Sequence, residues 1–212
     1  MENILVSEDI KGIIPTGGKR LSPLDYTSRS FEDRYTKMDG FRKGVSWHIP
    51  TQELIDHLIA YGPLVSVGSG YGYTESLAIS KGVDIIATDI NPTDTNGWCR
   101  DGEHYCDVEN LEATEAIKKY NDRNVFMAWP PYDTPMAYNV ASEMEVGNYL
   151  IYIGEGYGGC TGNDDFFEYL TENFEELSDV TIPRWDGIYD SCQIYRKLKW
   201  WKEMIEDNLK RV

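Results

Sequence analysis

The feature that most constrains the fold of this chain is the alternation of short apolar runs with helical stretches beyond residue 50. Runs rich in β-branched or aromatic residues predict strands at 64–67, 84–90, 103–106, 124–129 and 148–154. Helical patterns follow some of these runs, at 74–82, 109–120 and 164–177. Parallel neighbouring strands need a crossover, usually a helix, to join them. The pattern therefore predicts an α/β fold in which helices cover both faces of a mostly parallel sheet.

Two of the expected helices carry an apolar stripe at helical spacing. Thr51 is a suitable N-cap for the first, whose stripe consists of Leu54, Ile55, Leu58 and Ile59 and stops at Gly62-Pro63. The second helix presents on one face Phe166, Leu170, Phe174 and Leu177. Beyond it, two further runs flank Asp186-Gly187, a turn signal that predicts an antiparallel hairpin.

The first 45 residues are polar and rich in Gly and Pro, with one short helical pattern at 30–38. About 150 residues make an ordinary domain, so the remaining length fits a single one. We therefore expect an N-terminal extension or lid over residues 1–45 and one domain over residues 46–212.

The composition restricts the partners and the compartment of the protein. Its 20 basic and 36 acidic residues give a net charge of −16, which opposes binding to naked nucleic acid because phosphates carry the same sign. No stretch approaches the roughly 18 apolar residues of a membrane span, and the N-terminus lacks a signal-peptide pattern. We expect a cytoplasmic protein without a membrane partner.

The cysteines and histidines do not indicate a disulfide framework or a metal site. The four cysteines form no C-x-x-C pair; they are Cys99, Cys106, Cys160 and Cys192. The three histidines lack the i, i+4 spacing that places two ligands on one helical face. We therefore expect no bound metal.

A glycine cluster follows the first predicted strand, with the sequence V-G-S-G-Y-G-Y over residues 67–73. Such a turn lets a ligand approach the backbone and rest against the N-terminus of the next helix. Tyr73 stands where the dinucleotide fingerprint G-x-G-x-x-G has its third glycine, which disfavours NAD. Asp89 ends the next strand, about 20 residues beyond the turn, where a carboxylate can accept hydrogen bonds from ribose hydroxyls. Together these motifs favour an adenosine-type ligand.

With these motifs the chain resembles the class I S-adenosylmethionine-dependent methyltransferases over roughly residues 46–198. The strings that carry the resemblance are V-S-V-G-S-G-Y-G, T-D-I-N-P and A-W-P-P-Y-D-T-P-M-A. The chain is more similar still to a methyltransferase-like group of bacteria, viruses and fungi, through W-H-I-P, W-P-P-Y-D-T-P-M-A and I-G-E-G-Y-G-G-C-T. The resemblance implies a seven-stranded Rossmann-like sheet with an antiparallel last hairpin, and S-adenosylmethionine as the cofactor.

The resemblance also implies roles for the matched residues. The expected cofactor-binding residues are Gly68, Ser69, Gly70, Gly72, Tyr73, Asp89, Ile90, Asp107 and Val108. Among them Asp89 would hold the ribose hydroxyls and Asp107 the adenine amino group, although Asp107 also suits a helix N-terminus. Many family members carry an acid at the position of Ser66. Because serine cannot balance the cofactor's ammonium group, backbone carbonyls or another acid must do so.

The expected catalytic residues follow the fourth and fifth predicted strands: Trp129, Pro130, Pro131, Tyr132, Asp133 and Glu155. Amino-directed methyltransferases use a polar residue, two prolines and an aromatic ring that stacks on a planar substrate. Trp129 replaces the polar residue and its side chain accepts no hydrogen bond, so backbone carbonyls or Asp133 would accept from the target N–H. Glu155 would orient or deprotonate the substrate, or else bind backbone N–H groups of its own loop.

We therefore expect methyl transfer from S-adenosylmethionine to a nitrogen, rather than an oxygen, of a small or planar acceptor. The acidic charge favours a small molecule or a protein over nucleic acid as this acceptor. Two alternatives stay open. A nucleobase amino (adenine-type) methyltransferase is favoured by the two prolines and tyrosine, and a non-catalytic S-adenosylmethionine or adenosine binder by Ser66 and Trp129.

Overall fold

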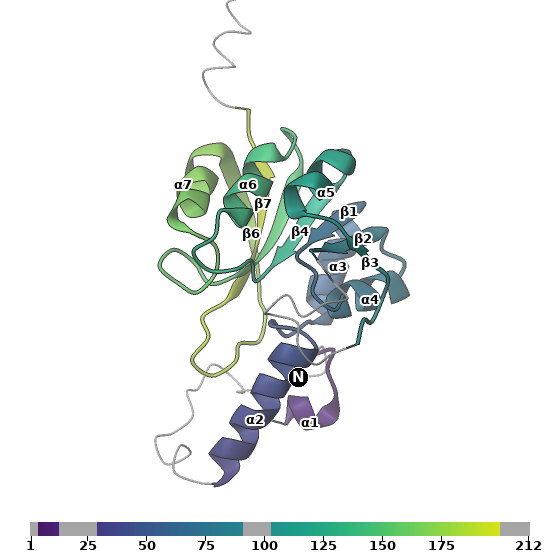
Figure 1. The fold of residues 1–212 in the computed structure, drawn as a ribbon, viewed down its shortest axis with the longest axis vertical. Helices are drawn as coiled ribbons and strands as arrows, with labels where there is room; N and C mark the ends of the chain where they lie inside the picture. Colours follow the sequence, from purple (N-terminus) through teal and green to yellow (C-terminus); the bar gives the residue numbers. More distant parts are fainter. Residues whose placement is uncertain (1–3, 13–28, 91–102, 200–212) are drawn as a thin grey trace, which may run out of the picture.

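The computed structural model describes residues 4–12, 29–90 and 103–199, and its core is one seven-stranded sheet (Figure 1). The strands are β1 (Leu64–Val67), β2 (Ile85–Asp89), β3 (Val108–Asn110), β4 (Asn124–Ala128), β5 (Tyr149–Gly154), β6 (Phe174–Val180) and β7 (Ser191–Lys197). Their order is β3-β2-β1-β4-β5-β7-β6. The first five are parallel to their neighbours, and β7 runs antiparallel to both β5 and β6. This is the class I methyltransferase fold that the resemblance implies.

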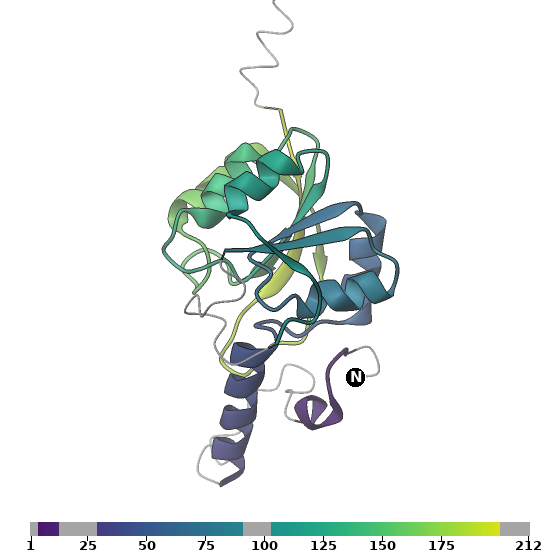
Figure 2. The ribbon, with the colours of Figure 1, turned by 45° about the vertical axis from the view of Figure 1, so that its right-hand side comes forward.

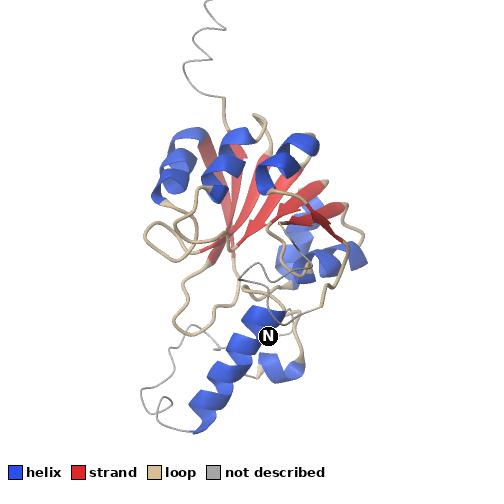
Figure 3. Cartoon of the chain, in the orientation of Figure 1, coloured by secondary structure: helices blue, strands red, loops and turns tan. Residues whose placement is uncertain are grey.

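Two layers of helices cover the sheet, one on each face (Figure 3). One layer holds α5 (Ala113–Lys119), α6 (Met136–Glu143) and α7 (Asp164–Asn173), and the other holds α3 (Gln52–Ala60) and α4 (Tyr73–Ser80). Successive residues of a strand serve opposite layers: Val65 packs with the first and Leu64 with the second. All four residues of β1 are buried, as expected for a central parallel strand.

The described N-terminal residues pack beside the carboxyl edge of the sheet. They include α1 (Glu8–Lys11) and α2 (Arg29–Gly44), and α2 projects away from the sheet (Figures 1 and 2). A third apolar cluster holds this segment, with the side chains of Ile4, Val6, Ile10, Phe41, Ile49 and Trp185. Ile4 also forms a β-bridge with Thr51. The helix α2 is longer than the pattern at 30–38 predicts.

The helix predicted after Thr51 is present, with its N-cap. The Thr51 Oγ1 atom accepts a hydrogen bond from the backbone N–H of Leu54 at 3.1 Å. Leu54, Ile55 and Leu58 are buried, whereas Ile59 is exposed because it lies at the edge of the stripe.

The third strand was predicted at the wrong place. Residues 103–106 form no strand, and β3 begins at Val108, where it pairs with Ala87 of β2 over only three residues. The aromatic residue that suggested a strand, Tyr105, instead packs its ring on Tyr73 at 4.8 Å. This contact between side chains, rather than a backbone ladder, accounts for the apolar character of residues 103–106.

Two further predictions near the C-terminus need correction. The helix predicted to end at residue 177 ends at Asn173, and Phe174 begins β6, so Leu177 lies in a strand and is 42% exposed. The antiparallel pairing of the last two strands is confirmed, and so is the turn at Asp186-Gly187, where the Ile188 N–H donates to the Trp185 carbonyl at 3.1 Å and Gly187 has a φ of 79°. The turn does not join the two strands directly, as a tight hairpin would require. Residues 181–190 form a long connection between the two strands. The connection is long because it carries Trp185 into the third apolar cluster, where its Nε1 atom donates to the Trp47 carbonyl at 3.1 Å.

No helix within the described ranges is long and apolar enough to cross a bilayer.

Lys197 links β7 to the end of α6 and provides a test of this packing. It is buried, and its Nζ atom donates to three carbonyls, those of Ala141, Ser142 and Met144. Lys197→Met should lower the free energy of unfolding by about 2–4 kcal/mol, because these carbonyls lose a charged donor. Urea denaturation measures this loss. The exposed control Lys81→Met should stay within about 0.5 kcal/mol of wild type, and equal losses for both variants would contradict the assigned role.

Candidate functional site

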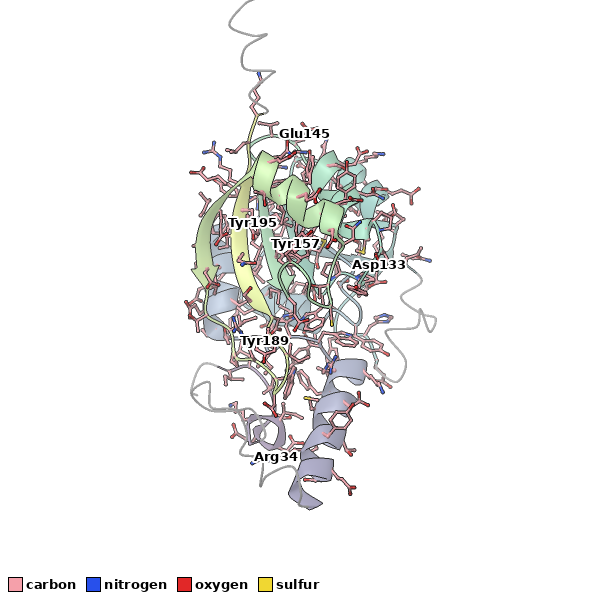
Figure 4. The ribbon with its side chains drawn as sticks, turned by 90° about the vertical axis from the view of Figure 1, so that its left-hand side faces the viewer. Arg34, Asp133, Glu145, Tyr157, Tyr189 and Tyr195 are labelled. Carbon is pink, nitrogen blue, oxygen red and sulfur yellow. The ribbon has the colours of Figure 1, made fainter. Side chains whose placement is uncertain are left out.

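A cavity of about 380 Å³ opens at the carboxyl ends of β1, β2 and β4. Its walls come from the glycine loop, the end of β2, the loop after β4 and the segment between α2 and α3. The predicted site residues that line it are Gly68, Ser69, Gly70, Tyr73, Asp89, Trp129, Pro130, Pro131 and Tyr132. Ligands of parallel sheets bind at this edge, so the two groups of motifs meet where the fold predicts a site. Figure 4 shows this edge near Tyr189, with Glu145 at the opposite edge.

The glycine loop and Asp89 are joined directly. The Gly70 N–H donates to Asp89 Oδ2 at 2.7 Å, and the Ser69 N–H and hydroxyl both donate to the Thr88 carbonyl. Gly68 has a φ of 68°, and a Cβ there would meet Met136 Cε at 3.0 Å. A side chain at this position would be strained and would fill the wall of the cavity.

Four of the expected cofactor residues do not line the cavity: Gly72, Ile90, Asp107 and Val108. Gly72 is required for packing, because a Cβ there would lie 2.5 Å from Cys106 Sγ. Ile90 and Asp107 are exposed, and Val108 lies beside the glycine loop at the start of β3. The last two residues of the T-D-I-N-P string, Asn91 and Pro92, lie outside the described residues.

Trp129 lies at the junction between β4 and the cavity. Its backbone N–H donates to the Ile153 carbonyl at 2.7 Å, and its indole Nε1 donates to Asp190 Oδ2 at 3.2 Å. Its φ of 53° lies in the left-handed region, which a bulky residue rarely adopts without compensating contacts. The ring lies 5.4 Å from the ring of Trp47. These contacts hold the indole in the cavity wall.

Tyr132 and Asp133 lie further along the same loop. Tyr132 is 60% exposed and lines both the main cavity and a smaller one of about 280 Å³. Asp133 lines only the smaller cavity, and its N–H donates to the Gly162 carbonyl at 2.9 Å. Asp133 is therefore separated from the glycine loop.

Glu155 is buried and binds the backbone of its surroundings. Its Oε2 atom accepts from the Cys160 N–H and its Oε1 atom from the Tyr189 N–H, each at 2.8 Å. The carboxylate thus joins the loop after β5 to the segment before β7, and it does not line the main cavity. Of the two roles that the sequence left open, this geometry supports loop stabilisation.

Two other polar residues of the cavity wall act within the protein. His48 is buried, and burial lowers its pKa to about 4, so the ring is neutral at physiological pH. Its Nε2 atom lies 2.9 Å from Thr74 Oγ1. The Tyr73 hydroxyl donates to the Leu5 carbonyl at 3.0 Å and so ties the N-terminal segment to the glycine loop.

Glu75 is a functional candidate that sequence reasoning missed. It lies in the first turn of α4, is only 3% exposed and lines the cavity, and the Ser66 hydroxyl donates to its Oε1 atom at 2.5 Å. Burial, and to a smaller extent the nearby Asp89 carboxylate, raise the pKa of Glu75 to about 7. Glu75 thus places a buried carboxyl group next to Ser66, the position where the resemblance leads us to expect an acid. The signal available in the sequence was an acid just beyond the glycine turn.

Asp190 is the second residue that the sequence did not indicate. It is almost fully buried, and its Oδ1 atom has no hydrogen-bond partner in the described part of the chain. Burial raises its pKa to about 6. Through its other oxygen it orients the indole of Trp129.

Several solved structures are similar to this chain at low identity. Magnesium protoporphyrin IX methyltransferase from Synechocystis is 13% identical, with a TM-score of 0.46 over 91% of this chain and 99% of that one. An N-methyltransferase from Bradyrhizobium japonicum is 12% identical, with a TM-score of 0.42 over 70% of this chain and 96% of that one. A SAM-dependent methyltransferase from Methanosarcina mazei is 14% identical, with a TM-score of 0.46 over 68% and 97%.

No protein-family model matches the chain, and no curated protein matches it. Structural similarities of this size carry no argument about a ligand or a reaction. The functional proposal therefore rests on the residues of the cavity.

The raised pKa of Asp190 gives a test of its burial. An unfolded aspartate loses its proton near pH 3.8, whereas the folded protein keeps this one up to about pH 6, so ionisation between these values destabilises the fold. Asp190→Asn stays neutral and should gain about 1–3 kcal/mol of unfolding free energy relative to wild type between pH 4 and pH 7. Urea denaturation at both pH values measures this gain. The exposed control Asp122→Asn should show no comparable change, and a constant difference for Asp190→Asn would refute the assignment.

Proposed function

We propose that the protein is an S-adenosylmethionine-dependent methyltransferase that acts on a nitrogen of a small or planar acceptor. The observation that carries the proposal is the Asp89 carboxylate, held 2.7 Å from the Gly70 N–H in one wall of a cavity whose other wall is Trp129-Pro130-Pro131. One cavity thus contains both an acid that can bind ribose hydroxyls, Asp89, and a rigid loop with an aromatic ring that can position the acceptor. The motifs of the methyltransferase-like group support membership in that group.

The polar groups of the cavity fit this cofactor. S-adenosylmethionine carries an ammonium group, two ribose hydroxyls and a sulfonium. Asp89 can accept hydrogen bonds from the hydroxyls, and Glu75 can pair with the ammonium group once it has lost its proton. The narrow space at Gly68, where a Cβ would meet Met136 Cε, suits a ligand that approaches the backbone.

The loop after β4 would position the acceptor. When bound, the cofactor would supply a methyl group on a sulfonium for transfer to the acceptor nitrogen. The carbonyls of Pro130 and Pro131 already accept hydrogen bonds from Gly162 and Thr134. The Trp129 carbonyl, which accepts no hydrogen bond from the described residues, would accept from the target N–H and so aim the nitrogen lone pair at the methyl carbon. The rings of Trp129 and Tyr132 would stabilise the sulfonium charge.

The cytoplasm is the compartment that we propose. Among the described residues, Cys106, Cys160 and Cys192 are free thiols, as is usual in a reducing compartment. The charge of −16 continues to favour a small molecule or a protein over nucleic acid as the acceptor.

The role of Asp89 is tested by cofactor affinity. Asp89→Ala should weaken binding of S-adenosylhomocysteine by about 1.5–3 kcal/mol, the contribution of hydrogen bonds to a charged group. Isothermal titration calorimetry measures the affinity. Asp84→Ala is the matched control, because it removes the same charge just before β2, at the opposite edge of the sheet. Unchanged affinity in Asp89→Ala would exclude Asp89 as the ribose acid. Labelled methyl transfer from S-adenosylmethionine to a metabolite extract separates an enzyme from a binding protein.

The role of Glu75 is tested by the pH dependence of the same affinity. Below about pH 7 Glu75 is protonated and must lose its proton to pair with an ammonium group, so affinity should fall by up to about tenfold per pH unit from pH 7 to pH 5.5. The ligand's α-amino group stays protonated over this range. Glu75→Gln should bind weakly and without this pH dependence. Glu115→Gln, an exposed acid in the first turn of α5, should behave as wild type. A wild-type affinity that is constant from pH 5.5 to pH 7.5 would contradict the role.

A further inference from the structure

The cavity is also lined by Arg42, with which no acidic side chain of the described residues forms an ion pair. Arg42, in the last turn of α2, lines the cavity with its guanidinium carbon 4.2 Å from the ring centre of Trp47 and 5.9 Å from that of Trp129. Its Nε atom is buried and has no hydrogen-bond partner among the described residues. With a net charge of −16 on the chain, carboxylates greatly outnumber cations, yet Arg42 has no ion pair within the described ranges.

The nearest carboxylates do not satisfy this arginine. Asp39 lies on the same helix but forms an ion pair with Lys43 at 2.6 Å. Asp190 acts on Arg42 through space, while its Oδ2 atom accepts from Trp129. Burial lowers the pKa of Arg42, but a guanidinium stays charged at physiological pH. Its fork of donors is therefore available to an anionic group of a ligand.

The position of Arg42 in the fold assigns it to the acceptor rather than to the cofactor. Arg42 lies over Trp47 and over Trp129, which follows β4, and it shares the cavity wall with Cys160, which follows β5, whereas Asp89 ends β2. Three strand spacings separate β2 from β5, roughly 14 Å at 4.8 Å per strand. The carboxylate of S-adenosylmethionine is bonded to the same carbon as the ammonium group, which places it with Glu75 beside β1.

We propose that the methyl acceptor is a planar molecule that carries an oxyanion, a carboxylate or a phosphate, and that Arg42 binds this oxyanion. The proposal rests on the proposed function, since it names the class of acceptor for the same site. The flat faces for such a molecule are the rings of Trp129 and Tyr132, which line the same cavity. The stacking of Arg42 on Trp47 restricts the guanidinium and so lowers the entropic cost of binding an anion.

The test compares two probes of equal shape on protein saturated with S-adenosylhomocysteine. Indole-3-carboxylate carries the oxyanion, and indole-3-carboxamide replaces it with a neutral amide. Isothermal titration calorimetry should show at least tenfold tighter binding of the carboxylate by wild type. Arg42→Met should abolish this preference, Arg42→Lys should keep part of it, and Lys81→Met, which removes an exposed cation outside the cavity, should leave it unchanged. Far-ultraviolet circular dichroism verifies that each variant is folded.

Three results would overturn the proposal. One is equal binding of the two probes by wild type, and another is the same preference in Arg42→Met. The third is a tenfold loss of S-adenosylhomocysteine affinity in Arg42→Met, which would assign Arg42 to the cofactor's carboxylate. Failure of the proposed function is a separate result. It would appear before either probe is added, as a wild-type protein that binds no S-adenosylhomocysteine in a titration with that ligand alone. A parallel series with phenyl phosphate and phenol, under the same conditions, distinguishes a phosphate-bearing from a carboxylate-bearing acceptor.

Discussion

The hydrogen bond from the Gly70 N–H to the Asp89 carboxylate is the interaction on which the site depends. It joins the loops that follow two adjacent parallel strands, β1 and β2, whose pairing already aligns their carboxyl ends. The positive φ angles of Gly68, Gly70 and Gly72 let the chain turn sharply enough to aim the Gly70 N–H at the carboxylate. Together with the two hydrogen bonds from Ser69 to the Thr88 carbonyl, this bond fixes the glycine loop relative to β2 and so forms one wall of the cavity.

The cavity has an electrostatic polarity that follows from its position across the sheet. Buried carboxyl groups of Glu75 and Asp89 lie on the side of β1 and β2, and Arg42 lies on the side of β5 and β7. A buried carboxylate is costly unless a cation accompanies it, which gives the acidic side a preference for a cationic ligand. The rings of Trp47 and Trp129 pack together in the cavity wall, and the Arg42 guanidinium lies over both of them. This arrangement suits two ligands of different charge that meet at the loop after β4.

The sequence predicted the parts of the fold that have strong local patterns. The apolar runs of β1, β2, β4 and β5 are buried on both faces, so their hydrophobicity is continuous and visible. The edge strand β3 has no such pattern, because its three residues are only partly buried, and it was placed wrongly. Phe174 fits both the stripe of α7 and the start of β6, so periodicity alone extended the helix too far.

The residues of the candidate site also fall into two groups, those that a local sequence pattern identifies and those that it does not. Residues next to a strand end, such as Asp89 and Trp129, were identified because their position in the chain places them at the edge of the sheet. Arg42 and Asp190 were not identified, because Arg42 reaches the cavity through the packing of α2 and Asp190 contacts Trp129 from the long connection before β7. Glu75 was missed because its partnership with Ser66 depends on how α4 lies against β1. Tertiary contacts of this kind have no periodic signature.

The most direct test of the account is a crystal structure of the protein grown with S-adenosylhomocysteine. The account predicts the ribose hydroxyls on the Asp89 carboxylate, the ammonium group beside Glu75 and the sulfur atom facing the loop that begins at Trp129. Electron density for the ligand at another place, or none in this cavity at saturating concentration, would contradict it.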